Sequence, residues 1–166
     1  IAERLRIMYR RKDVFFIPNG VVIHKKVDDD DFLKKSGLKK NKYLLSVGRF
    51  VPEKGFHDLI ESYGAMDQSH LPLVIAGEAD HETAYSKKLK HLAAYHGCIL
   101  PGFISRSMLA QLYSHARLFI LPSYHEGLPL ALLEALSFNV DVLVSNIPAH
   151  RELGLEKESY FSPGNI

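Results

Sequence analysis

A chain of 166 residues is long enough for one compact domain, and its formal net charge of +2 is too small to suggest a nucleic-acid-binding protein. Hydrophobic residues make up 46% of the chain and charged residues 24%, a balance that excludes a disordered or fibrous protein. The single cysteine, Cys98, excludes an internal disulfide framework and favours a reducing cytoplasm. No apolar run approaches the roughly 18 residues of a membrane span, although the slight basic excess leaves weak contact with the inner face of a membrane open.

The first 42 residues show little regular periodicity. Ile1, Leu5 and Met8 recur at helical spacing, and residues 14–17 form a short apolar run that ends in a turn signal. Residues 21–42 are polar and basic, and we interpret them as a linker with one short helix around Phe32 and Leu33.

From residue 43 onward, apolar runs alternate with stretches of helical periodicity. The runs predict strands at 43–47, 73–76, 98–100, 118–121 and 140–144. The intervening stretches predict helices at 56–66, 85–96, 108–116 and 130–137. This alternation predicts an α/β fold, a Rossmann-like open parallel sheet with helices on both faces. The strands read as continuous apolar runs rather than alternating ones, as expected for a sheet that is covered on both sides.

Such sheets bind ligands beyond the carboxyl ends of their strands, so the loops there are the candidate sites. The loop after the first strand carries two cations, Arg49 and Lys54, and it begins at Gly48. A guanidinium fork and a compact ammonium group both suit phosphate oxygens, and a glycine lets the backbone approach a ligand closely. We therefore predict a phosphate-binding loop, the alternative being two solvated surface cations.

The next two loops carry weaker signals. Gly77, after the second strand, suits a tight turn or a close approach of the backbone. Phe103, after the third strand, either offers a surface for stacking a base or belongs to the core.

Two glutamates follow the fourth strand. Glu126 precedes a helix whose first turn is expected to contain Pro129, and Glu134 lies about two turns into that helix on its apolar stripe. The rise of a helix separates these carboxylates by on the order of 10 Å, which suits two hydroxyl-bearing groups of one ligand rather than one metal ion. Free N–H groups after Gly127 and Leu128 favour an anion there. The alternative for Glu134 is a salt bridge to a buried cation.

These loops together resemble the carboxyl-terminal domain of the retaining family-four, or group 1, glycosyltransferases over about residues 14–166. The segments that carry the resemblance are GRFVPEKG at 48–55, IAGEAD at 75–80, PGFIS at 101–105 and PSYHEGLPLALLEAL at 122–136. The resemblance implies the GT-B architecture of two facing Rossmann-like domains. Residues 1–40 would then be a remnant of the amino-terminal domain with the interdomain linker. Residues 41–166 would be a donor-binding domain truncated at its carboxyl end, and a first residue other than Met agrees with a fragment.

The resemblance also implies an activity and assigns residues to it. The full-length protein would be a hexosyltransferase-type enzyme of polysaccharide biosynthesis that takes sugar from a UDP- or GDP-sugar with no metal or other cofactor. Arg49 and Lys54 would hold the diphosphate, Glu126 the sugar hydroxyls, and Glu134 the ribose. The other donor-binding residues implied are Gly48, Gly77, Phe103, Ile104, Gly127, Leu128 and Pro129. The expected partners are the nucleotide-sugar donor and the missing acceptor domain, without which the isolated chain should be inactive.

Departures from the family and rival functions stay open. Val22 stands where the family often has an Asp, and Ala79 stands where it often has a second glycine. The acidic run 28–30 offers an Asp-x-Asp pattern for a metal-dependent transferase, although it lies in a polar linker and is more simply a solvated turn. A non-catalytic nucleotide-binding module is the main alternative in another class. A dehydrogenase is disfavoured because no G-x-G-x-x-G follows the first strand.

Overall fold

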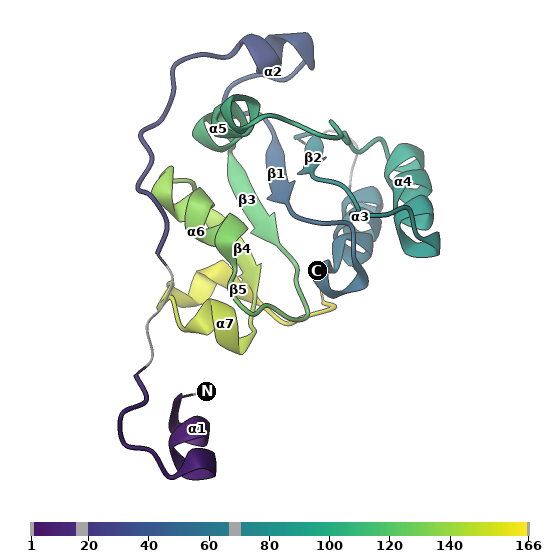
Figure 1. Cartoon of the computed structure of the whole chain (residues 1–166). Helices are drawn as coiled ribbons and strands as arrows, with labels where there is room; N and C mark the ends of the chain where they lie inside the picture. The colour runs from purple at the N-terminus through teal and green to yellow at the C-terminus, as the bar shows by residue number, and fades with distance from the viewer. Residues whose placement is uncertain (1, 16–19, 67–70, 166) are drawn as a thin grey trace.

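The sheet predicted from the apolar runs is present in the computed structural model, which describes residues 2–15, 20–66 and 71–165 (Figure 1). Every neighbouring pair of strands runs parallel. The order across the sheet is β2 (Leu73–Ala76), β1 (Leu44–Val47), β3 (Leu118–Leu121), β4 (Val142–Ser145) and β5 (Tyr160–Phe161). The predicted α/β class and the open parallel sheet are therefore confirmed.

The strand predicted at 98–100 is reduced to one bridge beside β2. Ile99 lies opposite Val74, and the N–H of Ile75 donates to the carbonyl of Ile99 at 3.0 Å. Pro101 lies two residues after Ile99, and because proline has no N–H it cannot extend the pairing. The position of this strand was predicted correctly, but its length was not.

The order in which successive strands are added to the sheet reverses between β1 and β3. From β1 the chain moves outward to β2 and Ile99, then crosses back to the other side of β1 and continues through β3, β4 and β5. The loops that follow β1 and β3 therefore leave in opposite directions, and such a reversal opens the crevice in which open α/β sheets bind ligands. Residues 48–55 and 122–129 border this crevice.

Helices cover both faces, and each face has its own core. On one face, α3 (Phe56–Ala65) and α4 (Ala84–Tyr95) bury residues such as Phe56 and Leu89 against β1 and β2. On the other face lie α2 (Asp31–Lys35), α5 (Arg106–His115) and α6 (Leu130–Ser137), which surround Tyr113 and Phe119. Each large apolar side chain buried in this way contributes about 1.5–3 kcal/mol. The two cores hold the sheet edge that carries the crevice in a fixed shape.

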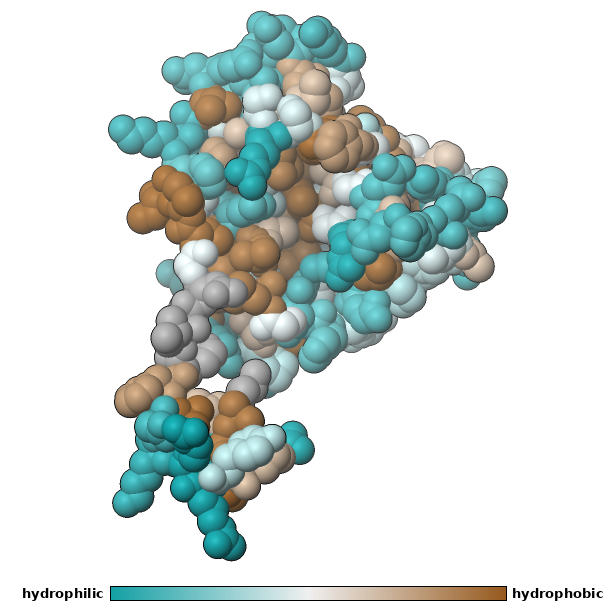
Figure 2. All heavy atoms as spheres, viewed as in Figure 1, coloured by the Kyte–Doolittle hydropathy of each residue, from teal (hydrophilic) through white to brown (hydrophobic). Residues whose placement is uncertain are grey.

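The amino-terminal segment contributes little to these cores. Helix α1 (Ala2–Tyr9) confirms the helical spacing of Leu5 and Met8, but none of its described residues is buried. Figure 1 shows it apart from the sheet, and Figure 2 shows apolar side chains on its surface. Val14 and Phe15 belong to no strand, and the rest of the strand predicted at 14–17 lies outside the described residues.

The short helix expected around Phe32 and Leu33 is α2, and Leu33 is part of the core. Three short elements after β4 were not predicted. They are α7 (Pro148–Arg151), the 3-10 helix η2 (Lys157–Ser159) and β5. Each spans four residues or fewer, which is too short for a periodic pattern. Within the described part of the chain, no helix is both long and apolar enough to cross a lipid bilayer.

Candidate functional site

A cavity of about 740 Å³ opens at the carboxyl edge of the sheet, between the loops that follow β1 and β3. Its size suits a small organic ligand. The residues predicted from sequence that line it are Gly48, Arg49, Lys54, Glu126, Gly127, Leu128 and Glu134. The structure thus brings most of the predicted site together, at the place where the strand order reverses.

Two backbone contacts fix the loops on either side of this cavity. Gly55 has a left-handed φ of +66°, and a Cβ at this position would lie 2.3 Å from the carbonyl oxygen of Pro122. The N–H of Tyr124 donates to the carbonyl of Glu53 at 2.8 Å. Glu53 belongs to the 3-10 helix η1 (Pro52–Lys54), so this helix is held against the loop after β3. The side chains of Lys54 and Glu126 are thereby brought face to face.

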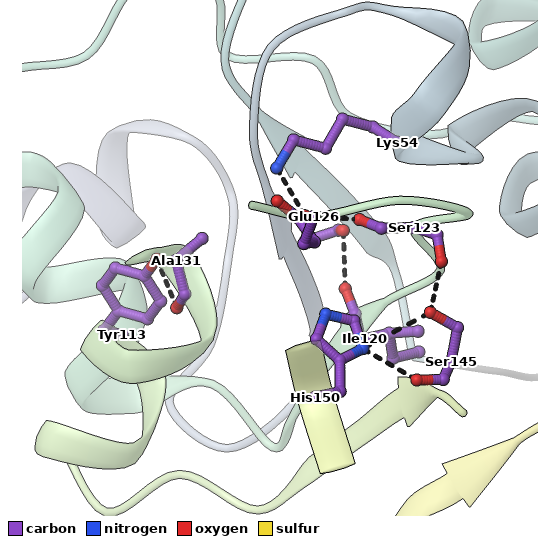
Figure 3. A network of polar contacts seen from close by, with 9 residues as sticks. Lys54, Tyr113, Ile120, Ser123, Glu126, Ala131, Ser145 and His150 are labelled. Atoms are coloured by element: carbon purple, nitrogen blue, oxygen red, sulfur yellow. Dashed lines mark hydrogen bonds and ion pairs between the residues drawn. The ribbon is translucent and has the colours of Figure 1, made fainter. Parts of the chain in front are cut away.

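Lys54 and Glu126 form an ion pair on the cavity wall. The Nζ of Lys54 lies 2.6 Å from Oε1 of Glu126, and the two side chains are only 17% and 7% exposed. Ser123 donates its hydroxyl to the same Oε1 at 2.7 Å (Figure 3). Among the described residues, these bonds fall on Oε1, so Oε2 is left to accept a hydrogen bond from a ligand. The sequence assigned separate roles to the two residues and did not predict that they touch.

Glu134 accepts a hydrogen bond from a buried hydroxyl group. Tyr113, which is fully buried in α5, donates to Oε2 of Glu134 and lies equally near the carbonyl of Ala131, each at 3.1 Å. Burial, and then the charge of Glu134, raises the pKa of Tyr113 well above its ordinary value, so the phenol keeps its proton. The alternative of a salt bridge is wrong for the described residues, since Glu134 pairs with none of their cations.

The start of α6 differs from the prediction. The helix begins at Leu130, and Pro129 precedes it with φ −81° and ψ 69°, which are not helical values. The N–H of Leu130 donates to the carbonyl of Leu128 at 2.9 Å, so it is not free for an anion. None of the described side chains caps this helix. The positive end of the helix dipole still faces the cavity, because Leu130 and Ala131 line it.

Arg49 and Gly77 make contacts with other residues in place of the expected ligand contacts. Arg49 lines the cavity but forms an exposed ion pair with Asp80 at 2.9 Å. A Cβ on Gly77 would lie 2.0 Å from the carbonyl oxygen of Gly48, and its φ is +140°. The close backbone approach predicted at Gly77 is therefore an approach to the neighbouring loop, at Gly48, which lines the cavity.

Besides Gly77, three predicted residues lie outside the cavity lining. Phe103 is 89% exposed, so the alternative that placed it in the core is wrong. Ile104 packs against the core, and Pro129 is buried before α6. Their contact with a nucleotide stays a prediction.

Sequence reasoning missed two residues that hold the glutamates. Ser123 lies three residues before Glu126, and this spacing of a hydroxyl and a carboxylate in a tight loop is a usable signal. Tyr113 falls within the helix predicted at 108–116, and nothing in its local sequence points to Glu134, 21 residues away.

The acidic run lies at the opposite edge of the sheet. Carboxylate oxygens of Asp29, Asp30 and Asp31 lie within 4.8 Å of one another. The carbonyl of Asp29 is 3.2 Å from Nε2 of His115, at the end of α5 where β3 is about to begin. Lys34 pairs with Asp30 at 2.6 Å, and this hydrogen bond lowers the pKa of Asp30. The run therefore does not share the cavity with Lys54.

Comparisons with known proteins indicate the same family that the sequences of the four loops resemble. The family model described as glycosyl transferases group 1 matches residues 28–163. The O-antigen chain mannosyltransferase RfbU of Salmonella typhimurium is 28% identical over 142 residues, which cover 86% of this chain and 40% of RfbU. The O-antigen chain mannosyltransferase B of Escherichia coli is 30% identical over 125 residues, which cover 73% of this chain and 33% of the relative. The chain thus spans well under half the length of these relatives.

The solved structures agree on the fold. Anabaena HepE, solved in complex with UDP and glucose, superposes with a TM-score of 0.79 and is 23% identical, covering 93% of this chain and 45% of HepE. The parallel sheet, the cavity at its reversal point and a family match over residues 28–163 lead to one assignment. This chain belongs to the group 1 glycosyl transferases.

Proposed function

We propose that the chain is the donor-binding domain of a glycosyltransferase that uses a nucleotide-diphosphate sugar. The observation that carries this proposal is the gathering of Lys54, Glu126 and Glu134 around one cavity at the reversal point of the sheet. A cation suits the diphosphate. The two carboxylates, which Ser123 and Tyr113 hold in place by hydrogen bonds, suit the hydroxyls of a sugar and a ribose. The UDP and glucose in the HepE structure support a ligand of this class.

The arrangement suggests how the donor is activated. Departure of the leaving group places negative charge on the diphosphate, and preorganised positive groups stabilise that charge as it develops. The Lys54 ammonium has three donors, so it can keep its bond to Glu126 while donating to a phosphate oxygen. Arg49 can exchange Asp80 for the diphosphate, because that pair is exposed. The proposal needs no metal ion, since the chain supplies these cations.

The longer protein is proposed to transfer the sugar to an acceptor held by a second domain. The relatives named as O-antigen mannosyltransferases favour GDP-mannose as donor and a polysaccharide precursor as acceptor. The similarity to HepE, which was solved in complex with UDP-glucose, favours UDP-glucose as donor instead. Action in the cytoplasm, at the inner face of a membrane, is part of this proposal.

Calorimetric titration of this chain with UDP, GDP, ADP, UDP-glucose and GDP-mannose tests the proposal. We expect one base to be preferred, and its sugar-linked form to bind more tightly than the diphosphate alone. A module that only binds nucleotides would show no gain from the sugar. If none of the five ligands binds or raises the melting temperature, the proposed function is wrong.

Glu134→Gln is expected to weaken binding of the preferred nucleotide by about 1–2 kcal/mol, roughly 5- to 30-fold, because a charge-assisted bond to the ribose is lost. Titration with the matching 2′,3′-dideoxy nucleotide identifies the cause, since that ligand cannot form the bond and should bind both proteins alike. Glu82→Gln, which changes an exposed carboxylate paired with Lys87, is the matched control. An equal loss for both nucleotides would show that Glu134 is structural.

A further inference from the structure

His150, in the short helix α7, lies beneath the loop that carries Glu126 (Figure 3). Its side chain is fully buried. Its Nδ1 lies 2.7 Å from the carbonyl oxygen of Ser145, at the end of β4. A carbonyl oxygen only accepts hydrogen bonds, so Nδ1 must carry the proton and donate it. The structure therefore defines the tautomer of this ring.

His150 is linked to the cavity wall through Ser145 and Ser123. Nδ1 of His150 is bonded to the backbone carbonyl of Ser145 and lies 3.4 Å from the hydroxyl of the same residue. The hydroxyl of Ser145 donates to the carbonyl of Ser123, and the hydroxyl of Ser123 donates to Oε1 of Glu126. Both serines are fully buried, so water does not compete for these bonds. Lys54 binds the same Oε1. Helix α7 is thus connected to the Lys54–Glu126 pair through three buried side chains.

The other ring nitrogen makes this arrangement sensitive to protonation. Nε2 of His150 is the one fully buried side-chain nitrogen or oxygen without a hydrogen-bond partner in the part of the chain that the structure describes. With the proton on Nδ1, Nε2 carries only a lone pair. Protonation would create a buried N–H with no acceptor, and it would add a positive charge that both Glu126 and Lys54 sense.

The surroundings of His150 favour the neutral ring. Burial lowers its pKa most, and Lys54 lowers it further, whereas the bond to Ser145 and the charge of Glu126 oppose the shift. The net pKa lies below the ordinary 6.5, so the ring is neutral at pH 7.5.

We propose that His150 is a positioning residue, whose neutral imidazole holds Glu126 in place through Ser145 and Ser123. It touches no ligand, since it does not line the cavity. Its effect on sugar binding rests on the proposed function, because Glu126 is the residue assigned to the sugar hydroxyls. Its effect on the Lys54–Glu126 pair does not depend on that function.

Two substitutions separate the hydrogen bond from the packing. His150→Asn keeps an N–H on the atom bonded to Cγ, where Nδ1 stands, whereas His150→Leu keeps bulk but has no donor. The ¹⁵N resonance of the Lys54 ammonium, recorded on this chain by NMR, reports on the pair with Glu126. We expect it to be nearly unchanged in His150→Asn and displaced in His150→Leu. An identical resonance in all three proteins would overturn the proposal.

Wild-type protein provides a test that does not depend on the folding of a variant. Long-range ¹⁵N–¹H spectra at pH 7.5 should show the proton on Nδ1 of His150, and a proton on Nε2 would overturn the proposal. When the pH is lowered from 7.5 until the His150 ring takes up its second proton, the Lys54 resonance should shift in step with the ring. That step should be absent in His150→Asn, and its presence there would also contradict the proposal.

The same variants connect the positioning role to sugar binding. For the sugar nucleotide that the chain prefers, UDP-glucose or GDP-mannose, we expect affinity to fall about tenfold in His150→Leu and to stay within about threefold in His150→Asn. Affinity for UDP or GDP alone should not change, because neither has a sugar for Glu126. A tenfold loss for both ligands would show general damage and contradict the role. If no nucleotide binds wild type, the proposed function fails while the NMR results still decide the role of His150.

Discussion

Lys54→Ala is expected to weaken binding of UDP- or GDP-sugars to this chain by about 2–4 kcal/mol, roughly 30- to 700-fold. The variant removes the most enclosed cation of the cavity wall, which is only 17% exposed. It also leaves Glu126 as a carboxylate without its cation, so the wall repels an incoming diphosphate. Calorimetric titration with the preferred sugar nucleotide measures both effects together.

A control variant and a double variant separate the loss of attraction from the repulsion by Glu126. Lys87→Ala removes an exposed lysine that pairs with Glu82 at 3.2 Å, and it should not change affinity. Lys54→Ala combined with Glu126→Gln removes the repulsion as well as the attraction, so the double variant should bind the diphosphate alone better than Lys54→Ala does. Affinity of Lys54→Ala within threefold of wild type would reject the assignment of Lys54 to the diphosphate.

Gly55→Ala is expected to lower the free energy of unfolding by about 3 kcal/mol and the melting temperature by about 6–12 °C. A methyl group at this position would lie 2.3 Å from the carbonyl oxygen of Pro122, and the backbone has a left-handed φ of +66°. The added methyl group would be fixed to the backbone of Gly55, and the atom it meets belongs to the backbone of Pro122. Neither backbone can move without a cost in free energy. The shift that relieves it would pull Lys54 from Glu126, and affinity for the sugar nucleotide should fall with stability.

Gly37→Ala is the matched control for this change. Gly37 has a φ of +69°, and a Cβ there would have no heavy atom within 4 Å. It shares the left-handed backbone of Gly55 without the clash, so its cost should be about 1 kcal/mol. Thermal unfolding of both variants gives the comparison. Equal melting temperatures for the two would show that the contact between Gly55 and Pro122 does not hold the loops together.

The fold was predictable where the sequence repeats a simple pattern. The apolar runs predicted β1 to β4, because strands buried on both faces are apolar at nearly every position rather than at alternate ones. The two-residue β5 and the four-residue α7 were missed, since each depends on packing against β4 rather than on its own sequence. The run at Ile99 was predicted as a full strand, and its pairing ends at the following proline.

The site was predictable in its location but not in its contacts. Parallel strands deliver their following loops to one edge, so residues after β1 and β3 had to meet there. The pairing of Lys54 with Glu126, however, joins positions 72 residues apart. It depends on how Gly55 packs against Pro122, which no local pattern encodes. Pro129 was expected inside the first turn of α6, but it stands just before the helix, with φ and ψ values that are not helical.

Tyr113 serves the hydrophobic interior and the binding wall at the same time. Its ring lies 5.5 Å from that of Phe138 in a stacked arrangement and 5.8 Å from that of Phe119, while its hydroxyl holds Glu134. Looser packing of these rings would displace the Tyr113 hydroxyl, and with it the Glu134 carboxylate that faces the cavity. On this face of the sheet, a mutation that weakens the packing of the core would therefore also weaken ligand binding by Glu134. Core stability and ligand binding are coupled here.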